Sequence, residues 1–432
     1  MECPEDARLF DDNNNGTRLI LKMFADFQKW YSPIHGYVCV VICMFGILTN
    51  LVHVAVLSRP NMRNSAVNCI LTAVAVCDIG TMGSYFVYIV HFVLQRDRKC
   101  APTFTHAWLQ FLLWHVVLSI ALHTTSLWLA VAMAFIRRMT LRVAALNSKW
   151  QQPKFAWKLC FVIYLVVFIL CVPNILVHEI LRIPDIPPWR PEGQCVSRFS
   201  ANYSQPIYTF TVSEVAQRNN CRLFKWNIWM IGILFKVIPC ILLVFLSIGL
   251  VRKIRDAERH RRKLTSVASN ASADTKPFKK KNSTPDRTTL MLVAILVVFL
   301  ITELPQGIIS ILCAIFTTDV HKYVYFYVGD ILDLLSLLNS CVNFVLYCVM
   351  SSRYRQTFWE VIIPTRAYSM WSKQRGTTPS NVSQVNNANN SIRMGRRQSY
   401  TPLATEPEIP RGGEYDSFDV SENQTSYQEH QL

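Results

Sequence analysis

Long apolar segments alternate with polar segments along this chain of 432 residues. A helix needs about 20 predominantly apolar residues to cross the hydrocarbon core of a bilayer, and seven segments reach that length. Runs such as Leu159 to Leu176 lack the polar stripe that a helix at the surface of a soluble protein carries. The pattern predicts an all-α integral membrane protein, a seven-transmembrane helix bundle with helices at about 35–57, 66–94, 107–134, 155–177, 227–251, 289–316 and 322–350.

The segments outside these helices have patterns of their own. Residues 1–34 are polar and acid-rich, which predicts an extracellular tail before a receptor domain at 35–351. Residues 352–363 place Tyr354 and Phe358 on one face, which predicts a short amphipathic helix in the membrane interface. Residues 364–432 are rich in Asn, Ser and Gln, which predicts a disordered cytoplasmic tail. The β-branched and aromatic run 207–212 predicts a hairpin over the mouth of the bundle.

The distribution of charge orients the chain. A net charge of +16 is compatible with nucleic-acid binding, but its location argues for a membrane protein without a nucleic-acid partner. The segment 252–287 holds twelve Lys or Arg and four acids, and the loop after the third predicted helix is basic without acids. Basic loops remain in the cytoplasm. We therefore expect a multi-pass protein of the plasma membrane with its N-terminus outside.

Two kinds of residue fit this orientation. Asn15 and Asn202 stand in glycosylation sequons on the predicted outer side. Four cysteines also lie on that oxidising side, and they allow three pairings between which the sequence does not choose. We expect Cys100 to tether the loop that carries Cys195 and Cys221. The four cysteines are Cys3, Cys100, Cys195 and Cys221.

Polar residues inside the predicted helices need a partner, because an ionisable group at the bilayer centre costs roughly 2.5–3.5 kcal/mol on insertion scales. Asp78 lies midway along the second helix. Neighbouring helices offer it Asn50, Ser126, Asn339 and Asn343. These oxygens suit a small hard cation such as sodium, or a polar network that joins helices. Both readings stay open, and no other cofactor is expected.

Several short motifs occur in an order typical of one receptor class. They are Gly46-Ile47-Leu48-Thr49-Asn50, Asp78 in helix two, Arg137 ending helix three, Pro239, Pro305 and Asn343-Phe344-Val345-Leu346-Tyr347. Together they resemble rhodopsin-like (class A) G-protein-coupled receptors over roughly 35–363. Asp286-Arg287-Thr288-Thr289 and Phe299 to Gly307 narrow the resemblance to invertebrate myosuppressin and FMRFamide-like peptide receptors.

That resemblance implies a short peptide ligand ending in Arg-Phe-amide. Glu303, Asp330 and Asp333 would offer the ligand arginine bidentate partners; otherwise these acids serve hydrogen bonding within the membrane or lie exposed at a loop boundary. Aromatic, imidazole and amide side chains nearby would hold the phenyl ring and the amide. These candidates are Tyr88, Trp114, His115, His123, Gln306 and Tyr327.

Departures from the receptor pattern concern the inner end of the helices. Ile136 and Arg138 replace the usual acid and aromatic beside Arg137, so Asp286 is the nearest candidate partner for Arg137. Phe344 replaces the helix-seven proline. The switch and coupling candidates are Arg137, Pro239, Leu127, Asp286, Phe299 and Tyr347.

The expected partners follow from the resemblance: a heterotrimeric G protein of the inhibitory class, arrestin and receptor kinases at the tail, and membrane lipid. An amine receptor is the alternative among receptors, although Ser119 occupies the position where amine receptors carry an Asp. A transporter is a further alternative, but the chain shows no internal repeat. No enzyme motif is present, so we do not expect an enzyme.

Overall fold

A computed structural model describes residues 8–10, 13–96, 100–142, 149–183, 186–200, 202–271 and 287–363. Among them, seven helical stretches are long and apolar enough to cross a membrane. This confirms the predicted seven-transmembrane helix bundle. The stretches are Asn15–Leu57, Ala66–Leu94, His106–Thr140, Pro153–Val177, Glu214–Asp256, Ala294–Ile315 and Thr317–Val349.

The first helix starts earlier than predicted. Helix α1 runs over Asn15–Leu57, and Asn14 caps its start by accepting a hydrogen bond from the Gly16 amide at 2.8 Å. Within the predicted extracellular tail over 1–34, residues 15–34 are therefore helical. Helix α3 (Ala66–Tyr88) continues into the π-helix η1 (Ile89–Leu94), which agrees with the predicted 66–94. Helix α4 (His106–Arg142) ends eight residues beyond the predicted 134.

Like the second span, three further spans are built from more than one piece. The fourth consists of α5 (Pro153–Leu170) and α6 (Val172–Val177), separated at Cys171. The fifth consists of α7 (Glu214–Trp229), the π-helix η4 (Met230–Val237) and α8 (Ile238–Ala271). Its first turns are interrupted at 218–221, where three residues have positive φ. The sixth is α9 (Arg287–Ile315), and the seventh joins α10 (Thr317–Val320), η5 (His321–Tyr325) and α11 (Phe326–Met350).

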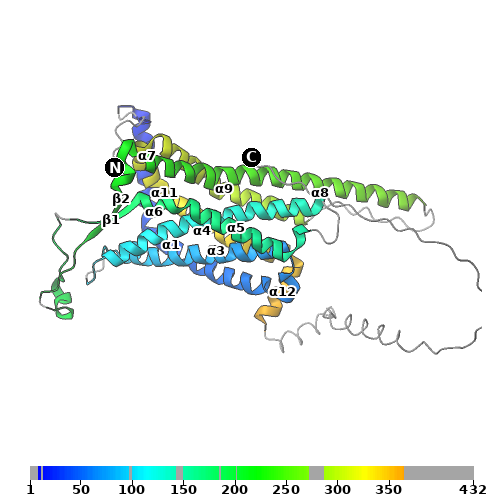
Figure 1. Ribbon diagram of the computed structural model, residues 1–432, viewed down its shortest axis with the longest axis horizontal. Helices are drawn as coiled ribbons and strands as arrows, with labels where there is room; N and C mark the ends of the chain where they lie inside the picture. The colour runs from blue at the N-terminus through cyan, green and yellow to red at the C-terminus, as the bar shows by residue number, and fades with distance from the viewer. Residues whose placement is uncertain are drawn as a thin grey trace, which may run out of the picture. The chain divides into compact units, whose positions relative to one another are not determined.

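The long helices lie side by side, and the two short strands lie at one end of them (Figure 1). We call this the outer end and the opposite end the inner end. The largest buried cluster joins α1, α3, α4, α5 and α11 near the inner end, around Leu57, Ile70, Leu129 and Ile136. A second cluster joins α1, α3 and α11 closer to the outer end. Many apolar side chains remain exposed on the outside of the bundle, as hydrocarbon contact requires.

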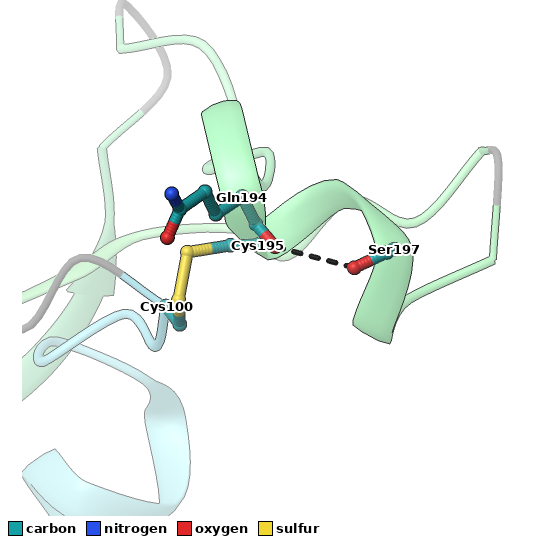
Figure 2. Close-up of a disulfide and its surroundings, with 4 residues drawn as sticks. All are labelled: Cys100, Gln194, Cys195 and Ser197. Carbon is teal, nitrogen blue, oxygen red and sulfur yellow. Dashed lines mark hydrogen bonds between the residues drawn. A yellow bond between two sulfur atoms is a disulfide. The ribbon is translucent and has the colours of Figure 1, made fainter.

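The predicted hairpin is present at the outer end. Strand β1 (His178–Arg182) pairs antiparallel with β2 (Tyr208–Val212), with His178 opposite Val212, and both strands contact α4. A disulfide joins Cys100 to Cys195, which lies in the 3-10 helix η3 (Gly193–Arg198) (Figure 2). The expected tether from Cys100 to this loop is therefore confirmed. Cys221 is also disulfide-bonded, whereas Cys3 lies outside the described residues.

The remaining helices are short. Helix α2 (Pro60–Arg63) and the 3-10 helix η2 (Lys149–Gln151) connect spans at the inner end. Helix α12 (Ser352–Ile362) follows the seventh span where an amphipathic helix was predicted, and it buries Tyr354 against the bundle. The predicted disordered tail, 364–432, lies outside the described residues.

Candidate functional site

A cavity of about 320 Å³ lies among the helices near the outer end. Its walls come from α3, α4, α6, α7, η4, α9, η5 and α11, together with His178 of the hairpin. This volume lies at the lower end of the range for small-molecule and cofactor sites. Polar side chains gather at two places in it: around Asp333, and at a floor formed by His123, Lys236 and Gln306.

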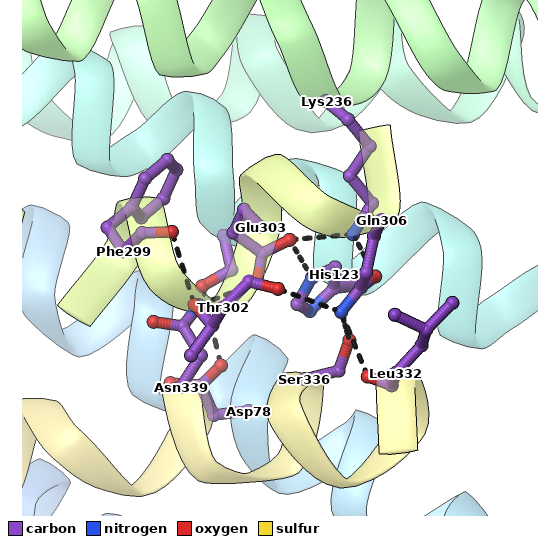
Figure 3. Close-up of polar contacts among 11 residues, drawn as sticks. Asp78, His123, Lys236, Phe299, Thr302, Glu303, Gln306, Leu332, Ser336 and Asn339 are labelled. Carbon is purple, nitrogen blue, oxygen red and sulfur yellow. Dashed lines mark hydrogen bonds and ion pairs between the residues drawn. The ribbon is translucent and has the colours of Figure 1, made fainter. Parts of the chain in front are cut away.

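Glu303 lies next to this floor but is 0% exposed. Its Oε2 accepts hydrogen bonds from Lys236 Nζ at 2.7 Å and from His123 Nε2 at 2.9 Å, and its Oε1 accepts one from Asn339 Nδ2 at 3.2 Å (Figure 3). Glu303 is not among the residues that line the cavity. The prediction that Glu303 pairs with a ligand arginine does not fit this arrangement, because Lys236 already provides its cation.

Lys236 was missed in the sequence, although the signal was present. It interrupts the apolar run 231–239 in the fifth span, where a lysine needs a partner for the same reason as an acid does. Its ammonium donates to Glu303 and also to Gln306 Oε1 at 3.0 Å. The Gln306 amide in turn donates to Ser336 Oγ at 2.8 Å. The floor therefore joins the third, fifth, sixth and seventh spans.

Asp333 faces the cavity, as predicted. Its Oδ2 accepts a hydrogen bond from the Tyr85 hydroxyl at 2.8 Å. No Lys, Arg or His in the described part of the chain lies within ion-pair distance of it. Asp330 instead lies 3.9 Å from His35 Nε2, with 33% of its side chain exposed, and does not line the cavity. Of the two aspartates, only Asp333 therefore lines the cavity, whereas Asp330 lies beside His35.

The other predicted ligand residues divide into three groups. His123 and Gln306 line the cavity. His115 and Tyr88 do not line the cavity: the two rings stack on one another, and His115 Nδ1 lies 3.3 Å from Oγ of the lining residue Ser119. The remaining two predictions, Trp114 and Tyr327, are not supported by the cavity: Trp114 is 53% exposed, and the tyrosines that line the cavity are Tyr85 and Tyr325. Trp114 therefore lies on the outside of the bundle.

His178 closes part of the outer wall. Its ring stacks on Phe210 across the hairpin, and its Nδ1 donates to the Asn174 carbonyl at 3.0 Å. Burial lowers the pKa of His178, and the bond to Asn174 opposes this change only in part. The lowered pKa favours the uncharged imidazole, which adds a ring without net charge to the wall.

The Asp78 cluster lies deeper than the floor. Ser126 donates to Asp78 Oδ1 at 3.3 Å, while Asp78 Oδ2 and Asn50 Oδ1 are buried without a hydrogen-bond partner in the described structure. A cavity of about 20 Å³ beside Ser126, Asn339 and Asn343 has room for about one water-sized particle. Asn339 donates to Glu303 and so connects this cluster to the floor.

At the inner end, Arg137 donates to the Tyr347 hydroxyl at 2.7 Å. Its predicted partner Asp286 lies outside the described residues. Phe299 and Leu127 pack in one buried cluster with Cys240, the residue after the buried Pro239. Two of the switch candidates, Leu127 of the third span and Phe299 of the sixth, therefore belong to the same buried cluster. The glycosylation candidates Asn15 and Asn202 are both exposed.

Comparison with known proteins identifies the family. Residues 37–364 match the family model described as "Serpentine type 7TM GPCR chemoreceptor Srw". The chain belongs to this family of G-protein-coupled receptors. It is a multi-pass membrane protein and not an enzyme, which confirms two predictions and removes the transporter alternative.

Individual relatives agree with this family. The chain is 32% identical to G-protein coupled receptor dmsr-1 of Caenorhabditis elegans, over 80% of this chain and 71% of that one. It is 24% identical to the sex peptide receptor of Drosophila melanogaster, over 78% and 74% of the two chains. It is 22% identical to the FMRFamide receptor of Drosophila melanogaster, over 82% of this chain and 59% of that receptor.

Proposed function

We propose that this receptor binds a short amidated peptide ending in Arg-Phe-amide, of the FMRFamide or myosuppressin type, in the cavity at its outer end. Two of its relatives are named as peptide receptors, for sex peptide and for FMRFamide. The proposal assigns the ligand arginine to Asp333. Aromatic side chains in the cavity wall, such as Phe224 and Tyr325, would pack against the phenyl ring.

The observation that carries this proposal is the environment of Asp333. Its carboxylate faces a cavity of about 320 Å³ and accepts a hydrogen bond from Tyr85. Among the described residues it has no ion-pair partner within 4 Å. A guanidinium that enters the cavity supplies the missing cation, and a bidentate arginine pair is strong and directional.

A double-mutant cycle tests this assignment. Cells expressing the receptor are treated with an amidated Arg-Phe peptide and with the same peptide carrying citrulline, which keeps the shape of arginine but has no charge. We expect Asp333→Asn to lower the potency of the arginine peptide at least tenfold and to leave the two peptides equally potent. The matched control is Asp330→Asn, which removes the other aspartate of α11 and should retain the preference for arginine.

Two results would contradict the proposal. If the wild-type receptor reaches the surface and answers no amidated Arg-Phe peptide, the ligand class is wrong. If Asp333→Asn still prefers the arginine peptide by the wild-type factor, the contact is wrong. Biogenic amines belong in the same screen, because Asp333 is also able to pair with an amine even though Ser119 stands at the usual amine position. A response to amines alone would favour that alternative.

The proposal extends to the inner end. There, ligand binding favours a conformation that admits the C-terminal helix of an inhibitory G protein into a groove between the helices. The contact of Arg137 with Tyr347 and the ordered set of receptor motifs support a class A mechanism. Arrestin and receptor kinases would act on the tail. Loss of the peptide response after pertussis toxin treatment would support the inhibitory class, and an unchanged response would exclude it.

The Asp78 cluster is proposed as a sodium site. Its hydroxyl, amide and carboxylate oxygens suit a hard cation, and two of its buried oxygens lack a partner in the described structure. Sodium bound there would stabilise one conformation of the receptor. Peptide affinity should then change when sodium replaces a bulky organic cation, and Asp78→Asn should abolish that dependence. An unchanged dependence in Asp78→Asn would contradict the site.

A further inference from the structure

The floor of the cavity has a feature that the arginine contact does not use. Lys236 lines the cavity, whereas its counter-charge Glu303 lies beside the floor and is 0% exposed. An ammonium group has three N–H donors, and in the described structure two are directed to Glu303 and Gln306 (Figure 3). One donor remains for an acceptor atom in the cavity.

The fixed charges around the cavity set which acceptor is favourable. Lys236 and Glu303 neutralise one another at 2.7 Å. Asp333 is neutralised once the arginine of a peptide pairs with it. With the His123 imidazole uncharged, the occupied cavity then carries no net fixed charge if the end of the peptide is a neutral carboxamide. A free carboxylate at the same place adds one unpaired negative charge, and an unpaired charge in a buried site is strongly unfavourable.

We propose that the Lys236–Glu303 pair makes the floor of the cavity a binding site for a neutral carboxamide group and selects against a carboxylate. This inference rests on the proposed function, because it assigns the end of the same peptide. The carboxamide oxygen accepts a hydrogen bond from the third N–H of Lys236. Glu303 does not contact the ligand; it acts as a specificity-determining residue because it cancels the charge that would otherwise attract a carboxylate.

The geometry gives Glu303 this role and not Asp333. Asp333 is bonded to Tyr85 and lies apart from the hydrogen-bonded set of Lys236, His123 and Asn339 that surrounds Glu303. Loss of the Asp333 charge should therefore reduce affinity for the arginine of both peptide forms. In receptor that reaches the surface, loss of the Glu303 charge should change how the receptor discriminates between the two forms.

The test measures the potency of one peptide in its amidated and free-acid forms. The ratio of the two potencies is determined for the wild type and for Glu303→Gln, which keeps the size of the side chain and removes its charge. We expect the wild type to prefer the amide and Glu303→Gln to reduce that preference at least tenfold, because the Lys236 ammonium is then free to pair with a carboxylate. The control Thr302→Val changes a buried neutral residue on the same helix and should keep the wild-type ratio.

A second variant keeps the proposal testable if Glu303→Gln fails to reach the surface. Lys236→Met with Glu303→Gln leaves the floor without charge, so the free acid gains no partner and the amide loses its donor. The double variant should answer the amide at least tenfold more weakly, without any gain in response to the acid. An unchanged amide potency in the double variant would overturn the inference.

The remaining outcomes separate this inference from the proposed function. If the wild type responds to neither peptide form, both proposals fall. If it responds equally to both forms, or if Glu303→Gln at the surface keeps the wild-type preference, the carboxamide site falls while the peptide receptor and the Asp333 contact stand.

Discussion

Removing Lys236 alone should destabilise the receptor far more than removing the whole ion pair. In Lys236→Met the carboxylate of Glu303, which is 0% exposed, loses its cation and keeps only His123 and Asn339 as donors. Breaking a buried pair costs about 3–5 kcal/mol, and a lone acid at the bilayer centre costs about 2.5–3.5 kcal/mol on insertion scales. A loss of about 3 kcal/mol corresponds to a factor of about 100 in the folding equilibrium, since about 1.4 kcal/mol is tenfold.

The double variant Lys236→Met with Glu303→Gln should recover most of that loss, because glutamine needs no cation. The assay compares the fraction of receptor at the cell surface and its thermal inactivation in detergent for the wild type, both single variants and the double variant. Lys154→Met serves as the control, since Lys154 is exposed. If the effects of the two single variants simply add in the double variant, the two charges are not coupled, and the reading of this pair as one unit would be refuted.

Three further predictions concern the packing of the bundle. Tyr354→Phe removes the hydroxyl that lies 2.7 Å from His53 Nδ1. The His53 ring is buried and its Nε2 has no partner in the described structure, so this change should destabilise the receptor by about 1–3 kcal/mol. Thermal inactivation measures the loss. Gly46→Ala adds a Cβ that meets the sulfur atoms of neighbouring helices and should cost about 1–3 kcal/mol, while Gly83→Ala, with nothing within 4 Å of its Cβ, should be neutral in the same assay. Cys195→Ser opens a disulfide across 95 residues and should lower stability by about 2–4 kcal/mol; a receptor with unchanged thermal inactivation would contradict this.

The spans were predictable because apolar length is a local property of the sequence. All seven were found, and the inner end of the first and the outer end of the fourth were placed at the observed residues, Leu57 and Val177. The start of α1 was not predictable in the same way. Its extension contacts a distant part of the chain, since Gln28 donates to the Phe326 carbonyl, and the Leu9 amide ahead of the helix donates to Asp319. Such contacts are decided by the folded bundle and leave no periodic signal.

The polar residues of the site were predictable as a set but their partners were not. Composition showed that acids within apolar helices need a reason, and Asp333 does face the cavity. Whether an acid meets a ligand or another side chain depends on helix rotation, and this decides between Asp333 and Glu303. Trp114 shows the same limit, since an aromatic residue in a span faces either the cavity or the hydrocarbon. Lys236 is different, because its position within an apolar run is a signal that the sequence alone provides.

The floor also gives a physical reason for an acid at position 303. A carboxylate between the cavity and the Asp78 cluster is favourable only if a cation reaches it from another helix, and Lys236 does so from the fifth span. Asn339 then ties the same carboxylate to the seventh span at 3.2 Å. His123 of the third span bonds to the same carboxylate, so four spans meet at one charge. Any movement of the sixth span relative to the fifth must either carry Lys236 along or separate a buried ion pair. A group that engages Lys236 in the cavity therefore acts on the contact that holds these two spans together, which makes the occupancy of this floor a direct way for a ligand to influence the arrangement of the helices.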